Sequence, residues 1–148
     1  MFLSDAPSTT SRRAAPQAAP PLFGPVPAGF PSSVEDRAEG RLDIGTLVVR
    51  HPAATFFCRA AGESMTGAGI GDGDILVVDR SLAPRDGDIV VATLDGGFTV
   101  KRLKRHNGGW NLESANPAYP AFAVDPEAGI MVWGVVAWSL SRHCRRCD

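Results

Sequence analysis

A turn followed by a run of β-branched residues is the pattern that most constrains the fold of this chain. It occurs twice in close succession, as DGDILVVDR (72–80) and DGDIVVATL (86–94). Further short runs of aromatic and β-branched residues lie at 54–60, 97–103, 108–114 and 129–140. The stretch IVVATLDGGFTVKRL predicts a hairpin that turns at Asp95-Gly96. Helical periodicity is nearly absent after residue 50, so the chain is predicted to be mainly β, with a compact, twisted β domain.

The N-terminal part of the chain differs in composition from this β region. Residues 1–31 hold seven of the twelve prolines, together with many Ala and Ser residues. Because proline fixes φ and removes a backbone donor, we expect an extended, flexible arm over 1–30. The β domain is then expected over 31–140, followed by a basic tail at 141–148. At the start of that domain, EDRAEGRLDIGTLVV (35–49) is compatible with either a short helix or a strand.

Charge and cysteine content exclude several classes of protein. A formal net charge of −1 argues against a protein that coats DNA through a broad basic surface. Three cysteines in 148 residues indicate a reducing compartment rather than a disulfide framework. The N-terminus has no secretory signal, and the longest apolar run (129–140) is shorter than the roughly 20 residues that cross a bilayer. We therefore expect a soluble, cytoplasmic protein with no membrane partner.

The histidines and the C-terminal cysteines are the candidate metal ligands. HCRRC (143–147) supplies three ligands at most and has no second cluster to complete a site. It is interpreted as an unstructured tail. His51, His106 and His143 fall in no motif and are expected at the surface. We expect no metal and no cofactor.

The glycine-rich stretch AAGESMTGAGIGDGDILVV (60–78) has the composition of a phosphate-binding loop. A Walker loop requires a lysine directly before Ser or Thr, and the chain has no such pair. A dinucleotide-binding loop requires a third glycine where Asp72 stands, and it opens a helix, whereas a strand is expected here. The glycines are therefore interpreted as turns between strands.

Ser64, near the start of that stretch, is a candidate nucleophile with Lys101 as its base. On an extended strand, Thr99, Lys101 and Leu103 share one face. Burial disfavours the charged form of lysine and lowers its pKa by roughly 3–5 units, so that a desolvated amine accepts the proton of a serine hydroxyl. From spacing alone the alternative stays open, in which Ser64 caps a turn and Lys101 extends its amine to solvent. The run KRLKRH (101–106) alternates between faces and is expected to be a solvated edge strand.

Several longer motifs point to one family. AGFPS (28–32), HPAATFF (51–57), GESMTGAGIGDGDILVVDRS (62–81), GDIVVATLDGGFTVKRL (87–103), NPAYP (116–120) and VWGVV (132–136) resemble the LexA/UmuD family of self-cleaving Ser-Lys peptidases, and most of all its UmuD branch. The G-x-S-M sequence followed by GDGD and a strand is specific, and FTVKRL after it makes the match very specific. The resemblance implies a LexA/signal-peptidase-like β fold, with Ser64 as nucleophile and Lys101 as general base. It also implies that the backbone N–H groups of Glu63 and Ser64 are the oxyanion donors.

The resemblance further implies a target bond and partners. In the family a small residue followed by glycine is cut within the protein's own N-terminal region, and Ala28-Gly29 matches that site. It implies that the full-length protein is a homodimer and that a RecA filament on single-stranded DNA stimulates self-cleavage. The shortened form, residues 29–148, would then join a UmuC-like Y-family DNA polymerase in error-prone translesion synthesis during the SOS response.

Three departures from the family pattern stand beside these implications. Repressors of the LexA type carry a helix-turn-helix domain before the cleavage site, and the proline-rich 28 residues here leave no room for one, so sequence-specific DNA binding is not expected. UmuD proteins usually have cysteine where Ala28 stands, and the basic tail extends past the pattern. Two alternatives remain: a signal-peptidase-like protease, which requires a membrane anchor, and a non-cleaving dimeric regulatory module.

Overall fold

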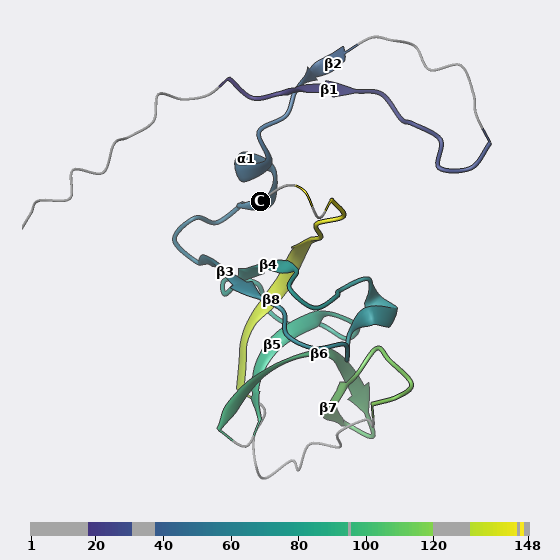
Figure 1. The fold of residues 1–148 in the computed structure, drawn as a ribbon. Coiled ribbons are helices and arrows are strands. Elements are labelled where there is room, and N and C mark those ends of the chain that lie inside the picture. The colour runs from purple at the N-terminus through teal and green to yellow at the C-terminus, as the bar shows by residue number, and fades with distance from the viewer. Residues whose placement is uncertain (1–17, 31–37, 95, 120–130, 145, 147–148) are drawn as a thin grey trace, which may run out of the picture. The chain divides into compact units, whose positions relative to one another are not determined.

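The computed structural model describes residues 18–30, 38–94, 96–119, 131–144 and 146 (Figure 1). The chain divides into two units, Met1–Ile44 and Gly45–Asp148, with the short helix α1 (Ile44–Val48) at the boundary. Among the described residues, regular structure consists mainly of strands, as the sequence predicts. Within the described ranges, we find no helix with the length and apolar character that a bilayer crossing requires.

The first unit contains a two-stranded antiparallel ribbon. Strand β1 (Pro21–Phe23) pairs with β2 (Ala38–Arg41), with Pro21 opposite Arg41. Every residue of both strands is exposed, so the ribbon has no core of its own. Its ends are joined by a hydrogen bond from the Leu42 N–H to the Pro20 carbonyl and by one from the Arg41 guanidinium to the Ala19 carbonyl. The segment 35–49, compatible from sequence with helix or strand, contains both β2 and α1 in its described part.

The second unit is a six-stranded antiparallel sheet in the order β3-β4-β8-β5-β6-β7. The strands are β3 (Thr55–Arg59), β4 (Ile75–Asp79), β5 (Ile89–Leu94), β6 (Gly97–His106), β7 (Gly109–Glu113) and β8 (Met131–Leu140). The last strand therefore lies between β4 and β5 and joins two hairpins into one sheet (Figure 1). Its pairings are irregular at Val77/Val78 and at Val91/Ala92, the kind of local shift that bends and twists a sheet.

The predicted hairpin is confirmed, but the prediction for the basic run is wrong. Strands β5 and β6 pair with Leu94 opposite Gly97, and Gly96 has a positive φ of 79°, as a tight turn requires; Asp95 lies outside the described residues. The basic run 101–106 lies in β6, which pairs with β5 on one side and β7 on the other, so it is not an edge strand. The local sequence shows that a strand forms but not which strands flank it.

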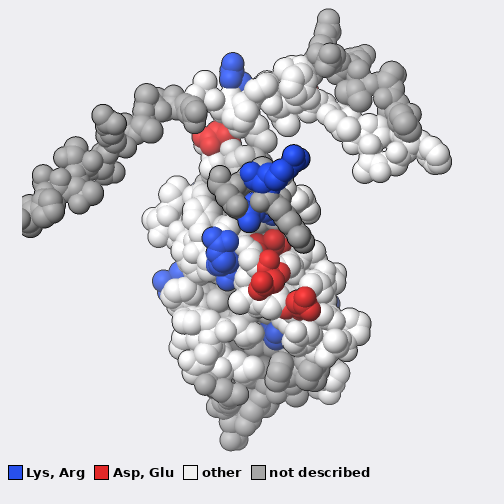
Figure 2. Space-filling view, in the orientation of Figure 1, with Lys and Arg blue, Asp and Glu red and all other residues white. Residues whose placement is uncertain are grey.

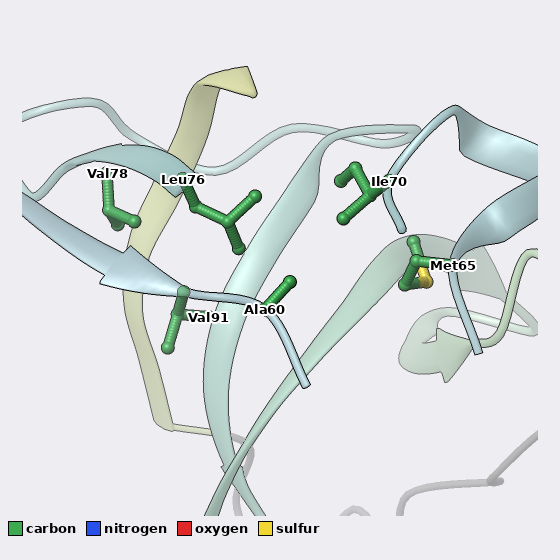
Figure 3. Packing of buried hydrophobic residues seen from close by; sticks show 6 residues of the cluster. All are labelled: Ala60, Met65, Ile70, Leu76, Val78 and Val91. Carbon is green, nitrogen blue, oxygen red and sulfur yellow. The ribbon is translucent and has the colours of Figure 1, made fainter. Parts of the chain in front are cut away.

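The core consists of two clusters of buried side chains. One contains Ala60, Met65, Ile70, Leu76, Val78 and Val91, and the other Val90, Ala92, Leu103, Leu112 and Val135. Figure 3 shows the first cluster, where Met65 and Ile70 come from the connection between β3 and β4 and lie near Leu76 of β4. Burial of these two side chains fixes the irregular connection that carries Ser64 against the sheet.

Candidate active site

Ser64 and Lys101 are in direct contact although 37 residues separate them in the sequence. The Nζ atom of Lys101 lies 2.9 Å from the Oγ atom of Ser64. Lys101 is only 6% exposed, and in the β5–β6 register it stands opposite Val90, which is fully buried. Burial lowers the pKa of the Lys101 amine from its ordinary value. The structure thus brings together a serine hydroxyl and an amine whose neutral form is favoured by its surroundings.

The loop before Ser64 depends on one glycine and one aspartate. Gly62 has a φ of 87°, a conformation that L side chains rarely adopt, and its N–H donates a 2.7 Å hydrogen bond to Oδ1 of Asp72. A 3-10 turn, η1 (Thr66–Ala68), begins directly after Met65. The N-cap residue of this turn is Met65, and among the described residues no side-chain hydrogen bond caps it, so Ser64 does not cap this turn. Its hydroxyl is engaged by Lys101 instead.

A second segment, 114–118 after β7, holds the Ser64 loop from outside. The Gly67 N–H donates to the Ala115 carbonyl at 2.6 Å, and a Cβ at Gly67 would lie 2.3 Å from that oxygen, so only glycine permits this approach. The Asn116 amide Nδ2 donates to the Glu63 carbonyl at 2.8 Å. Sequence reasoning assigned no role to Asn116. The Asn-Pro pair at 116–117 signals a turn, but it does not indicate which distant loop the asparagine side chain contacts.

The backbone amides next to the nucleophile candidate are free to act as donors. Neither the Glu63 N–H nor the Ser64 N–H donates a hydrogen bond to an atom of the described ranges. An unpaired N–H beside a serine hydroxyl is the geometry that stabilises an oxyanion formed on the serine's substrate. The two donors that the family resemblance implies are therefore unoccupied by acceptors of the described residues.

A pocket of about 320 Å³ opens beside Ser64. Its walls are mostly apolar and include Phe56, Cys58, Met65, Val91, Phe98 and Trp133. The rings of Phe56 and Trp133 meet edge to face with centroids 4.7 Å apart, and Phe98 lies 5.0 Å from Trp133. Burial raises the pKa of the Cys58 thiol, so this side chain lines the pocket in its neutral form. The pocket suits a short, apolar stretch of extended peptide.

The residues predicted as the cleavage site belong to the first unit. Ala28 and Gly29 are both exposed, and a Cβ added at Gly29 would meet no heavy atom within 4 Å. A segment that is to be cut must expose its backbone to the protease without disrupting a hydrophobic core. The segment around Ala28 and Gly29 meets this requirement because it is exposed.

The histidines and cysteines form no metal site in the described ranges. There we find no group of three His, Cys, Asp or Glu side chains that fits an ion. Cys58 is a free thiol, Cys144 is exposed, and Cys147 lies outside the described residues. His106 and His143 are exposed as predicted. On the face drawn in Figure 2, basic and acidic side chains of described residues lie among mostly uncharged ones, without a broad basic patch.

His51 is exposed but has a partner that the sequence did not reveal. Its Nδ1 lies 2.6 Å from Oδ2 of Asp79, at the end of β4. Oδ1 of the same carboxylate accepts hydrogen bonds from the hydroxyl and the N–H of Ser81. The hydrogen bond from the Ser81 hydroxyl, followed by that from His51, lowers the pKa of Asp79 to about 2. This cluster is a structural tie that joins the turn before β3 to the end of β4.

Known proteins match the chain over most of its length. The sequence profile described as Peptidase S24-like matches residues 21–137. Protein ImpA of Salmonella typhimurium is 45% identical over 129 residues, which cover 82% of this chain and 83% of ImpA. Protein SamA of Salmonella typhimurium strain LT2 is 47% identical over 121 residues, covering 81% and 84%. The LexA repressor of Dechloromonas aromatica is 43% identical over 108 residues, which cover 73% of this chain and 53% of the repressor.

Proposed function

We propose that this chain, which belongs to the Peptidase S24-like family of self-cleaving serine peptidases, cuts its own Ala28-Gly29 bond with Ser64 as nucleophile and Lys101 as general base. The observation that carries the proposal is the 2.9 Å contact between the Lys101 amine and the Ser64 hydroxyl, made by a lysine that is buried. A buried amine next to a hydroxyl has little structural value, because burial of a charged group is costly. The same arrangement is what a proton-accepting lysine needs.

The proposed chemistry follows from this contact. Neutral Lys101 takes the Oγ proton of Ser64 while Oγ attacks the carbonyl carbon of Ala28. The negative charge that develops on the Ala28 oxygen is stabilised by the backbone N–H groups of Ser64 and Glu63. The Lys101 ammonium then gives its proton to the Gly29 nitrogen as the peptide bond breaks, leaving an ester between Ala28 and Ser64. Lys101 next takes a proton from a water molecule as that water attacks the ester carbonyl. It returns the proton to Ser64 Oγ as the ester bond breaks, which releases residues 1–28 and restores both Ser64 and neutral Lys101.

The pocket beside Ser64 supports a peptide substrate of this kind. An extended segment places alternate side chains toward the pocket wall, and Pro27 and Pro31 favour extended backbone on either side of the bond. Ala28 is small enough to lie directly against the Ser64 loop. Because bond and catalyst belong to one polypeptide, their encounter needs no separate binding step.

The cellular setting proposed here rests on the relatives. By its similarity to ImpA, SamA and MucA the chain is a UmuD-like protein of SOS mutagenesis. We infer that it acts in the cytoplasm as a homodimer and that a RecA filament on single-stranded DNA stimulates its cleavage by favouring the conformation in which the bond enters the pocket. The product, residues 29–148, then serves as an accessory subunit of a UmuC-like Y-family polymerase that copies past lesions.

The test is the appearance of one fragment. Purified wild-type protein incubated with RecA, ATP and single-stranded DNA should yield a product that begins at Gly29, identified by intact-mass spectrometry and N-terminal sequencing. Ser64→Ala should yield none while keeping its melting temperature, because the change removes one small hydroxyl from a loop. Gly29→Lys should also resist cleavage although the dyad is intact, since a long side chain next to the bond does not fit a close cleft. A Gly29-terminated fragment from Ser64→Ala would show that another group is the nucleophile.

A further inference from the structure

We propose that Asn116 is a positioning residue that aims the Ser64 N–H at the developing oxyanion. The inference rests on the proposed function and assigns a role to a side chain outside the Ser-Lys pair. It starts from the hydrogen bond that the Asn116 amide donates to the Glu63 carbonyl at 2.8 Å, the shortest of the three that this carbonyl accepts.

The geometry of the peptide unit connects this hydrogen bond to catalysis. Glu63 and Ser64 share a peptide plane, and all peptide bonds in the described ranges are trans. In a trans peptide the C=O of one residue and the N–H of the next point in opposite directions. A donor that fixes the Glu63 carbonyl therefore fixes the Ser64 N–H as well. This N–H has no acceptor within the described ranges. Its direction therefore depends on the hydrogen bonds that hold the Glu63 carbonyl.

The orientation of the asparagine amide is itself fixed. Its Oδ1 accepts a 3.0 Å hydrogen bond from the Ala118 N–H, so Nδ2 is the end that faces Glu63. One side chain thus joins the turn at 116–118 to the peptide plane of the candidate nucleophile. The other donors to the same carbonyl are the Thr66 N–H at 3.3 Å and the Thr66 hydroxyl at 3.2 Å. Thr66 belongs to the Ser64 loop, so its two hydrogen bonds do not connect the loop to other parts of the unit. The hydrogen bond from Asn116 does.

That other part is the hairpin that carries the base. Segment 114–118 follows β7, and β7 pairs with β6 so that Glu113 lies opposite Arg102. Strand β6 also contains Lys101. A second contact, from the Gly67 N–H to the Ala115 carbonyl at 2.6 Å, fastens the loop to the same segment. The oxyanion donor and the general base are therefore positioned by one pair of strands. Loss of the Asn116 contact leaves the base in place and frees the donor plane to rotate.

The test separates these two effects with a pH series. First-order rates of self-cleavage without RecA, measured for the full chain across the alkaline range, have a midpoint set by Lys101 and a plateau set by the remaining catalytic groups. Loss of one oxyanion donor costs on the order of 100- to 1,000-fold in rate, so a misdirected donor should cost about 10- to 100-fold. Asn116→Asp, which keeps the acceptor for Ala118 and removes the donor, should lower the plateau by that factor and leave the midpoint unchanged.

Two further variants keep the test decisive. Asn116→Ala removes the donor without adding a charge and should reproduce the lowered plateau, and it carries the test if Asn116→Asp is unfolded by circular dichroism. Asn111→Asp makes the same chemical change in β7 and should cleave at the wild-type rate. A wild-type plateau in both Asn116 variants, or a shifted midpoint with an unchanged plateau, overturns the inference while the Ser-Lys mechanism stands. Absence of any Gly29-terminated product from wild-type protein overturns the proposed function itself.

Discussion

The β1–β2 ribbon and the Ser64 loop both contain few residues in regular secondary structure, but different kinds of contact hold them in place. The ribbon has formal strands, but all its residues are exposed and its ties are backbone hydrogen bonds and one arginine. The loop at 60–74 has only one 3-10 turn, yet Met65 and Ile70 are 3% and 4% exposed. Asp72 accepts a hydrogen bond from the Gly62 N–H within the loop, and Asn116 donates one to the Glu63 carbonyl from outside it. Regular secondary structure is therefore a poor guide to rigidity, whereas buried side chains and satisfied backbone groups are a good one.

This difference matches the two roles proposed for the regions. A catalyst must hold its groups within a fraction of an ångström, and the loop is fixed by contacts of that kind. A segment that is to be cut must instead leave its surroundings without a large loss of stability. The two units meet these demands separately, since the candidate dyad lies entirely in the second unit and the candidate bond in the first.

The largest expected effect is on Lys101. Lys101→Arg should remove self-cleavage at every pH, a loss of at least about 1,000-fold, because arginine remains charged. For the wild type, rates without RecA should rise with pH and level off below the ordinary lysine value, since the pKa of Lys101 is lowered by burial. A rate series from pH 7 to 11 on folded protein checks both. A flat wild-type profile, or cleavage by the arginine variant, would mean that another group is the base.

Lys101 also makes stability depend on pH, with a definite sign. Its lowered pKa means that the unfolded chain binds the proton more tightly, so the free energy of unfolding rises with pH from the lowered pKa up to the ordinary value of 10.5. Lys101→Met, which keeps the volume and removes the charge, should flatten this rise and stabilise the protein by about 1 kcal/mol at pH 7. Urea unfolding of both proteins at several pH values measures the difference.

A matched pair of apolar truncations, one in each region, tests how each region is anchored. Met65→Ala should lower the free energy of unfolding by about 2–5 kcal/mol, because it empties a site in the buried cluster. Leu22→Ala in β1 removes a side chain that is 40% exposed and should change it by about 0.5 kcal/mol or less. Equal losses in urea unfolding would contradict the view that only the loop is anchored by burial.

A separate prediction concerns the tie between His51 and Asp79. The pKa of Asp79 is lowered to about 2 in the folded protein, so its carboxylate contributes stability that is fully present above the ordinary value of 3.8 and is lost as pH falls through 2. Asp79→Asn should cost about 2 kcal/mol at pH 7 and weaken the loss of stability between pH 4 and 2. Glu39→Gln, which neutralises an exposed carboxylate in β2, serves as the control and should change neither quantity by more than about 0.5 kcal/mol. An acid transition identical to wild type in Asp79→Asn would exclude this carboxylate as its cause.

The sequence predicts strands well because alternation and turn glycines are local signals. The hairpin at Asp95-Gly96 and the strand that starts at Ile75 follow from such signals alone. The position of β6 inside the sheet does not, because it depends on β7 pairing with the edge of β6 that β5 leaves open. Nor does the place of β8, which comes from the far end of the chain to pair with β4 and β5. The Ser64–Lys101 pair follows from the resemblance of its motifs to a known family, because spacing alone leaves the turn-cap alternative open. Asn116 and the His51–Asp79 contact were missed, since hydrogen bonds over 53 and 28 residues leave no periodic trace.

Ser64 and Lys101 both lie in the second unit, and this affects whether the protease could cut other proteins. Cleavage at Ala28-Gly29 would remove none of the atoms of this pair or of the pocket beside it. The shortened chain would therefore keep the proposed catalytic pair after its own substrate has gone. A tethered segment faces the pocket at an effective concentration in the millimolar range, whereas a foreign peptide must reach it by ordinary diffusion and affinity. Covalent attachment of the substrate, more than the shape of the pocket, is then what confines the protease to a single bond.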